Sequence, residues 1–185
     1  MEKRVLVSAP GKIIWIGQYA VLHKGNPAHV LSVNKRVFVE AKLLEEELIK
    51  VHMPQFKLDV EGKWEGGEVI FNVDKETEDK LKFIKSAVSS VFEYIRKKGG
   101  KVGGVEILSL NDPAFTFEYG KSKSGLGSSA AATAAVVGAL MKLHGCELGK
   151  DIHLIHKLAH YSHYKAQKKI GSGFDIATAC FGCIK

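Results

Sequence analysis

The sequence predicts one globular domain that combines β-strands with α-helices, and three observations support this. Short apolar runs separated by glycine and proline fill residues 4–71, which is typical of strands. From Glu76 to Lys98, apolar residues instead recur every three or four positions, the period of an amphipathic helix. An alanine-rich run and a second periodic segment follow residue 127. A chain of 185 residues suits one domain with a good-sized core, or an incomplete piece of something larger.

The first part of the chain predicts strands at residues 4–8 and 13–16, separated by a turn at Ala9-Pro10-Gly11. A short strand and a turn are expected over residues 18–27, and a strand pair follows at 28–33 and 36–44. Residues 49–53, 56–60 and 69–71 resemble shorter strands joined by glycine-rich turns. Because this last region is charged and weakly patterned, we expect it to form a layer of surface hairpins.

The remaining elements are mostly helical. The helix from Glu76 to Lys98 should stop at Gly99-Gly100. Residues 102–110 alternate like a strand, and residues 115–119 are expected to pair nearby across the turn at 111–113. Ser128 is a favourable N-cap for an alanine-rich helix that continues to about His144, and Asp151 is one for a helix that continues to about residue 168. A second glycine loop at 171–175 then precedes a small-residue run.

The composition favours an anionic partner. The formal net charge is +7, and nucleic acid is one candidate partner, although the lysines are not gathered into one basic arm with interleaved aromatic residues. A phosphorylated small molecule fits equally well. No apolar run is long enough to span a membrane and no targeting segment is recognisable, so we expect a cytoplasmic protein without a membrane partner. The three cysteines suit a reducing compartment, and Cys180-Phe-Gly-Cys183 is expected to pack rather than bind zinc or react.

The glycine-rich stretch Ser124-Gly-Leu-Gly-Ser-Ser-Ala130 carries the clearest chemical signal. A tight glycine turn that leads into a helix N-terminus points free N–H groups and the positive end of the helix dipole at one spot, which favours phosphate. Nearby lysines add positive charge, and the two serine hydroxyls can hold Mg²⁺. The spacing is not that of a P-loop, and it fits only loosely a dinucleotide-binding loop. A plain turn that caps a packed helix is the alternative.

Three other features have both a functional and a structural interpretation. Lys12 lies between a Pro-Gly turn and an apolar run, where it either reaches into a cleft or lies along a strand edge. Asp175 is either a catalytic carboxylate or a helix N-cap. Four histidines spaced by three, four and three share one side of the helix after Asp151, as metal ligands or as a polar boundary: His153, His156, His160 and His163.

Taken together, Ala9-Pro-Gly-Lys12, the glycine loop and Ser172-Gly-Phe-Asp175 resemble the kinase superfamily that contains galactokinase, homoserine kinase, mevalonate kinase and phosphomevalonate kinase. All three motifs occur here in the family's order. The resemblance implies an α+β fold like domain 2 of ribosomal protein S5. It also implies that residues 1–185 form the N-terminal, ATP-binding domain of such a kinase, and that the family's C-terminal domain is absent from this chain. A fragment, a processed chain or one half of a split protein would each fit.

The resemblance also implies roles for single residues. Lys12 and Asp175 would be catalytic, and Ser128 or Ser129 would bind Mg²⁺. The ATP-binding residues would be Lys123, Ser124, Gly125, Leu126, Gly127, Ser128, Ser129 and Ala130. The acceptor would contact Lys12, Tyr19, Lys168, Lys169, Ser172 and Gly173. One departure concerns the metal: Tyr164 stands where mevalonate kinases carry a helical glutamate, which leaves Gln167 or a water as the second ligand.

Within the superfamily, the run Ala166-Gln-Lys-Lys-Ile-Gly-Ser-Gly-Phe-Asp175 most resembles phosphomevalonate kinases, which implies transfer of the γ-phosphoryl group of ATP to the phosphate of 5-phosphomevalonate. Because the acceptor is then an anion, a lysine-rich site suits it better than it suits plain mevalonate. The alternatives are a mevalonate kinase or another small-alcohol kinase, a nucleic-acid-binding module, and a non-catalytic ATP-binding fragment.

Overall fold

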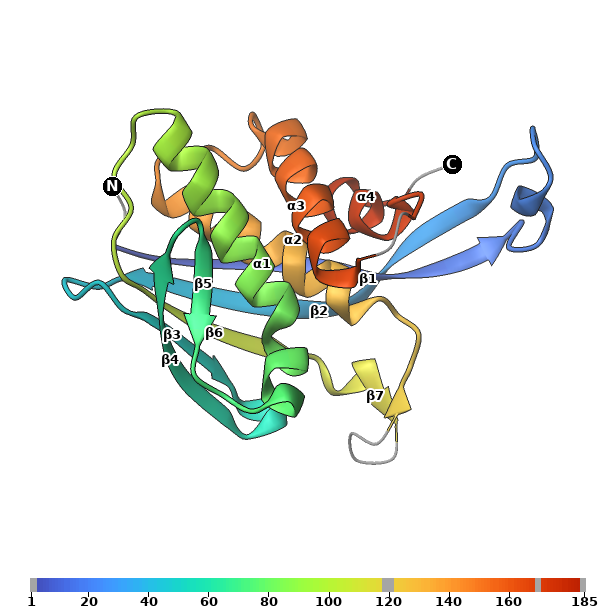
Figure 1. Cartoon of the computed structure of the whole chain (residues 1–185). Helices are drawn as coiled ribbons and strands as arrows, with labels where there is room; N and C mark the ends of the chain where they lie inside the picture. Colours follow the sequence, from blue (N-terminus) through green and yellow to red (C-terminus); the bar gives the residue numbers. More distant parts are fainter. Residues whose placement is uncertain (1–2, 118–121, 169–170, 184–185) are drawn as a thin grey trace.

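The computed structural model describes residues 3–117, 122–168 and 171–183 (Figure 1). Within them, a six-stranded sheet carries four α-helices on one face. The strand order is β1-β2-β6-β3-β4-β5, and every neighbouring pair is antiparallel except β3 and β6. The sheet strands are β1 (Arg4–Ile16), β2 (His29–Leu43), β3 (Ile49–Met53), β4 (Leu58–Glu65), β5 (Glu68–Phe71) and β6 (Val105–Asn111). The helices are α1 (Lys75–Lys97), α2 (Ser128–Leu143), α3 (Ile152–Gln167) and α4 (Phe174–Phe181). The mixed helix-and-strand fold is therefore confirmed.

The first two strands are longer than the sequence suggested. The predicted turn at Pro10 does not end β1, because β1 is an edge strand, where a residue without an N–H is tolerated. A register shift between Pro10 and Lys12 absorbs the irregularity as a bulge. The predicted pair at 28–33 and 36–44 is likewise one strand, β2. The predicted short strand at 18–22 is wrong, since this segment contains a 3₁₀ turn, η1 (Ala20–Leu22).

The middle of the chain forms the expected hairpins, but as part of the main sheet. A 3₁₀ turn, η2 (Pro54–Phe56), delays the start of β4 to Leu58. The connection through β4, β5 and α1 returns the chain to β6, which lies parallel to β3. A further 3₁₀ turn, η3 (Pro113–Phe115), redirects the chain after β6. The strand predicted at 115–119 therefore does not pair with residues 102–110: its described part, β7 (Thr116–Phe117), pairs with β8 (Ser122–Lys123).

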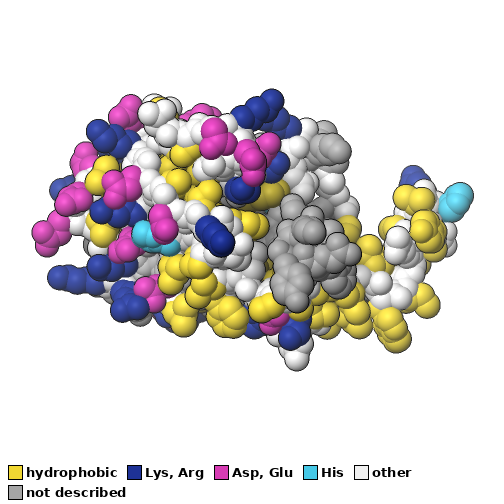
Figure 2. Space-filling view, turned by 90° about the horizontal axis from the view of Figure 1, so that it is seen from below, with side chains coloured by type: hydrophobic (Ala, Val, Ile, Leu, Met, Phe, Trp, Pro, Cys, Tyr) yellow, Lys and Arg dark blue, Asp and Glu magenta, His cyan; other side chains and the backbone are white. Residues whose placement is uncertain are grey.

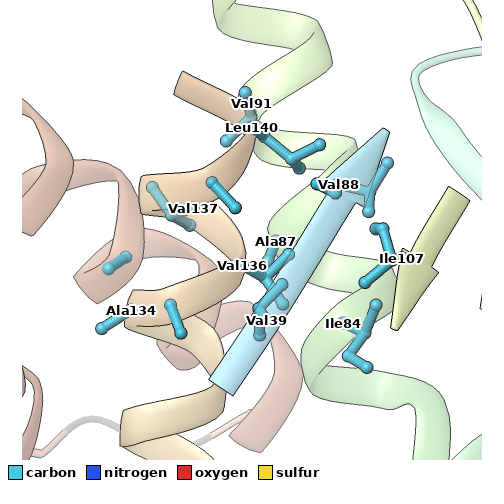
Figure 3. Packing of buried hydrophobic residues seen from close by; sticks show 14 of the residues in the cluster. Val39, Ile84, Ala87, Val88, Val91, Ile107, Ala134, Val136, Val137 and Leu140 are labelled. Carbon is cyan, nitrogen blue, oxygen red and sulfur yellow. The ribbon is translucent and has the colours of Figure 1, made fainter. Parts of the chain in front are cut away.

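The core lies between the sheet and the helices (Figure 3). Side chains of α1 and α2 interdigitate there with β2 and β6; Figure 3 labels Val39, Ile84, Ala87, Val88, Val91, Ile107, Ala134, Val136, Val137 and Leu140. Small alanine side chains let α2 lie close to the sheet, and α2 is apolar on nearly all sides because other elements surround it. This central helix is what fixes the position of the glycine loop at its N-terminus.

The opposite face of the sheet and the end of the β1–β2 hairpin carry exposed apolar side chains. The hairpin extends well beyond the body of the molecule, with η1 at its tip (Figure 1). We call residues 13–31, which form this end, the arm. In Figure 2, apolar side chains line the arm and the adjoining edge of the body, whereas charged side chains gather at the other end. Trp15 is 70% exposed and Leu22 is 77% exposed.

Among the helices that the structure describes, none combines the length and the apolar character needed to cross a membrane.

Candidate active site

Several backbone N–H groups at the glycine loop have no acceptor among the residues that the structure describes. Gly127 is the N-cap of α2 and adopts the left-handed conformation (φ 78°, ψ 38°), which glycine tolerates far better than serine. The predicted N-cap, Ser128, is instead the first helical residue. The first hydrogen bond of the helix runs from the N–H of Ala131 to the carbonyl of Gly127 (3.1 Å). The N–H groups of residues 128–130 therefore lack acceptors within the helix and lie at the positive end of its dipole.

The side of the loop that would meet a ligand is open. A Cβ atom added at Gly125 would meet no atom within 4 Å. The hydroxyl oxygen of Ser124 is buried and has no hydrogen-bond partner among the described residues. This hydroxyl directly precedes Gly125 in the sequence, and as an unpaired donor it suits a phosphate oxygen.

Lys12 is held against this loop by both ends of the residue. Its backbone N–H donates to the carbonyl of Leu126 (2.8 Å), and its ammonium Nζ donates to the carbonyl of Gly125 (3.0 Å). The neighbouring Gly11 is required here, because a Cβ at that position would lie 2.8 Å from the Leu126 carbonyl oxygen. The bulge in β1 thus brings the first predicted motif to the second.

The third motif lies at the start of α4, close to Lys12. The Nζ atom of Lys12 is 5.7 Å from the centre of the Phe174 ring, within the range of a cation–π interaction. Gly173, again left-handed (φ 71°), is the N-cap of α4, so Asp175 lies in the first turn and is not the cap. The Oδ1 atom of Asp175 accepts from the N–H of Ile176 (2.9 Å), and Lys12, whose ammonium group donates to Gly125, forms no ion pair with Asp175.

Asp175 borders a small cavity of about 100 Å³ between α3 and the second glycine loop. Tyr164 and Gln167, considered above for the metal, line this cavity together with Ser172 and Gly173. Gly173 is pressed against α3, because a Cβ there would lie 2.6 Å from the ring of His160. The structure therefore brings Asp175, Ser172 and Gly173 together, as the sequence predicted.

Ser128 and Ser129 face a different cavity, of about 360 Å³, on the other side of the loop. Its wall is formed mainly by the first half of α1 and by η2, with Phe56, Lys80, Lys82 and Phe83 among the lining residues. Sequence analysis did not single out these residues. The lysines belong to the charged face of an amphipathic helix and form ion pairs one turn apart, which is also the pattern of a solvated face.

Not every residue that was predicted to contact the phosphoryl acceptor lies near this site. Lys168 ends α3 in a left-handed conformation (φ 53°) and lines a separate cavity on the α1 side, with Lys82 and Lys85. Tyr19 is 77% exposed on the arm. Lys169 lies outside the described residues, and of Lys123 only the backbone, in β8, is described.

The four histidines of α3 do not act as one group. His153 and His156 contact the ring of Phe181, and His160 lies against the second glycine loop. His163 instead turns toward α1 and α2. Within the described ranges, no three His, Cys, Asp or Glu side chains are placed to hold a metal ion. Burial lowers the pKa of His163, whereas the charge of Asp175 acts in the opposite direction.

The site therefore consists of backbone N–H groups at the start of α2, a lysine fixed beside them and an acidic residue in the next glycine loop. The family model that matches is the GHMP kinase N-terminal domain, over residues 83–183. The chain belongs to this family.

Curated proteins similar in sequence show which members of this family the chain resembles. The chain is 38% identical to the phosphomevalonate kinase of Saccharolobus solfataricus over 97% of this chain and 48% of that protein. It is 31% identical to the mevalonate kinase of Pyrococcus furiosus, over 97% of this chain and 50% of that one. The chain thus spans about half the length of the curated relatives it matches.

Solved structures support the fold. The mevalonate kinase of Methanococcus jannaschii superimposes with a TM-score of 0.76 at 20% identity, over 98% of this chain and 53% of that chain. The phosphomevalonate kinase of Streptococcus pneumoniae, solved with phosphomevalonate and AMPPNP, gives a TM-score of 0.70 at 20% identity, over 95% and 47%. The predicted S5-like fold of this kinase family is confirmed.

Proposed function

We propose that this chain supplies the ATP-binding half of a phosphomevalonate kinase. The observation that carries the proposal is the contact of Lys12 with the glycine loop, which places one ammonium group beside a cradle of free N–H groups. The 38% identity to a phosphomevalonate kinase supports the choice of acceptor. The reaction would join an oxygen of the acceptor phosphate to the γ-phosphorus of ATP, break the bond from that phosphorus to the β,γ-bridging oxygen, and release ADP.

In this proposal, the residues of the site mostly position and neutralise charge, which is what phosphoryl transfer requires. Residues 124–130 would hold the phosphates of ATP through backbone N–H groups and the Ser124 hydroxyl. Lys12 would lie between donor and acceptor, where it reduces the repulsion between two anions. Ser129 or Ser128 would bind Mg²⁺, which supplies further neutralisation of the phosphate charge when bound.

Asp175 would have a limited part in proton transfer. A phosphate monoester has its second pKa near 6, so at neutral pH it arrives mostly as the dianion and needs no strong base. An alcohol acceptor has a pKa far above neutral and would require a general base. The loss of turnover on replacing Asp175 therefore indicates whether the acceptor is a phosphate or an alcohol.

A second candidate function is phosphorylation of mevalonate itself. The 31% identity to a mevalonate kinase favours it, and the placement of Lys168 away from Asp175 removes one of the cations that argued for an anionic acceptor.

The deciding experiment is Mg-ATP-dependent release of ADP by the longest natural polypeptide that contains this chain, with phosphomevalonate, with mevalonate, or with no acceptor. Turnover with phosphomevalonate alone is expected. Turnover with mevalonate alone would replace the first proposal by the second. A protein that binds ATP and is silent with both acceptors would be a non-catalytic or differently specific member.

We further propose that the arm is covered by the C-terminal domain that the family's longer members carry. This domain would be a continuation of the chain or a second chain. The exposed apolar side chains of Trp15, Ile16, Tyr19 and Leu22 support this. Residues 1–185 made alone should then bind a hydrophobic dye through the arm, and Trp15→Ser with Leu22→Ser should reduce the signal. Addition of the second half should remove it. A dye-free 185-residue chain would contradict the proposal.

We place this activity in the cytoplasm. Cys146, Cys180 and Cys183 are all free thiols, which a reducing compartment maintains.

A further inference from the structure

His163 is a buried histidine whose part in the site is not explained by the motifs. It is 4% exposed and lies in the C-terminal half of α3. Its ring stacks on Phe83 of α1, with the ring centres 5.1 Å apart and the planes 24° from parallel. Phe83 lines the cavity into which Ser129 opens. His153, His156 and His160 contact α4 or its N-cap, whereas the ring of His163 contacts α1 and α2 and also borders the small cavity that Asp175 lines.

The contacts of the ring define which of its nitrogens accepts a hydrogen bond. The Nε2 atom is 3.3 Å from the hydroxyl oxygen of Ser129 and 3.3 Å from the amide nitrogen of Gln167. With the Gln167 amide nitrogen as the donor, Nε2 is an acceptor, and in this tautomer the proton of a neutral ring lies on Nδ1. The Ser129 hydroxyl can then donate to Nε2 as well, and it shares the one lone pair of that nitrogen with the Gln167 amide.

This arrangement has a consequence for Ser129. A hydroxyl that binds a cation does so through an oxygen lone pair, and its proton must point to an acceptor on another side. In α2 the hydroxyl of a first-turn serine is otherwise free to rotate. A fixed imidazole acceptor removes that freedom and keeps the lone pairs directed toward the cavity.

We propose that His163 is a positioning residue that accepts the Ser129 hydroxyl proton and so directs the serine oxygen toward a divalent cation bound with the nucleotide. The inference rests on the proposed function, in which Ser129 helps to hold Mg²⁺. Gln167 completes the arrangement by a second contact to the same ring nitrogen, which limits rotation of the imidazole.

The test compares two substitutions with the parent protein, in the longest natural polypeptide that contains this chain. His163→Phe keeps a ring against Phe83 and removes the acceptor. His163→Gln places an amide oxygen near the position of Nε2 and restores it. The readout is the affinity for a fluorescent ATP analogue, measured with EDTA and with saturating Mg²⁺, so that the gain in affinity on adding the metal is obtained for each protein.

We expect His163→Phe to reduce the gain from Mg²⁺ by about tenfold, the value of one hydrogen bond beside a charged group. Its affinity without metal should stay within about twofold of the parent, because the backbone cradle is untouched. His163→Gln should recover most of the gain. A purely structural role would lower both affinities together and would not distinguish glutamine from phenylalanine.

His153→Phe is the matched control, because it makes the same change at an exposed position of the same helix. It should behave as the parent protein. An undiminished gain from Mg²⁺ in His163→Phe, or a glutamine variant no better than the phenylalanine one, would overturn the role of His163 while leaving the kinase proposal intact. A parent protein that binds no nucleotide under either condition would overturn both.

Discussion

Replacement of Gly127 by alanine tests the geometry that joins Lys12 to the glycine loop. Gly127 adopts a left-handed conformation, and a Cβ there would lie 3.2 Å from Cγ and 3.3 Å from Cε of Lys12. The variant therefore has two separate costs. The first is backbone strain, and the second is displacement of the lysine stem by a few tenths of an ångström.

Gly125→Ala separates these two costs. Gly125 has nearly the same backbone angle (φ 77°), but a Cβ there would meet nothing within 4 Å. Both variants should lose about 1–2 kcal/mol of unfolding free energy, the cost of a non-glycine residue in the left-handed region. For a chain of this size, that lowers the melting temperature by about 2–8 °C.

The two variants should differ in turnover. Displacement of Lys12 weakens its hydrogen bond to the Gly125 carbonyl and moves the ammonium group, so Gly127→Ala should lower kcat by about tenfold more than Gly125→Ala does. Thermal unfolding and steady-state ADP release measure the two effects. Equal melting temperatures for Gly127→Ala and the parent protein would refute the left-handed conformation of Gly127. Equal kcat for the two variants would refute the role given to the Lys12 contact.

Four further predictions follow from single residues. Lys12→Met should lower turnover by at least about 100-fold, and near-parental activity would remove Lys12 from the mechanism. Asp175→Asn should cause a moderate loss of turnover with a phosphate acceptor, whereas a near-total loss would indicate obligatory proton abstraction. Burial raises the pKa of Cys180 to about 12, so at about pH 8 roughly one Cys180 thiol in 10⁴ is ionised. A thiol reagent should therefore modify the exposed Cys183 before Cys180. Mass spectrometry of the labelled peptides checks the order of modification. The pKa of Asp74 is lowered by hydrogen bonds from Thr77, so this helix cap stabilises the fold above the ordinary carboxyl pKa and ceases to do so as the pH falls through the lowered value. Asp74→Ala should therefore lower the melting temperature at about pH 7, and this loss should shrink as the pH falls below the ordinary carboxyl pKa; a loss that stays the same at low pH would refute this cause.

The sequence by itself determined the features that local physics controls. The period of apolar residues identified α1 to within one residue at each end, because an amphipathic helix has to place one face in the core. The glycine loop was predicted to hold phosphate because a glycine turn at a helix N-terminus points free N–H groups at one spot, and the structure places Gly127 directly before α2. The three motifs resembled one kinase family in the right order, and the family is confirmed.

Only the tertiary structure decided how distant residues meet. The continuity of β1 through Pro10 depends on its position at the sheet edge, which no local pattern records. The contact of Lys12 with Gly125 joins residues 113 positions apart, and that of His163 with Ser129 joins residues 34 apart. Lys168, close to Asp175 in sequence, lines a different cavity because Lys168 is the C-cap of α3, whereas Asp175 lies in the first turn of α4. Such proximities arise from packing of whole elements, so they follow from the fold and not from spacing along the chain.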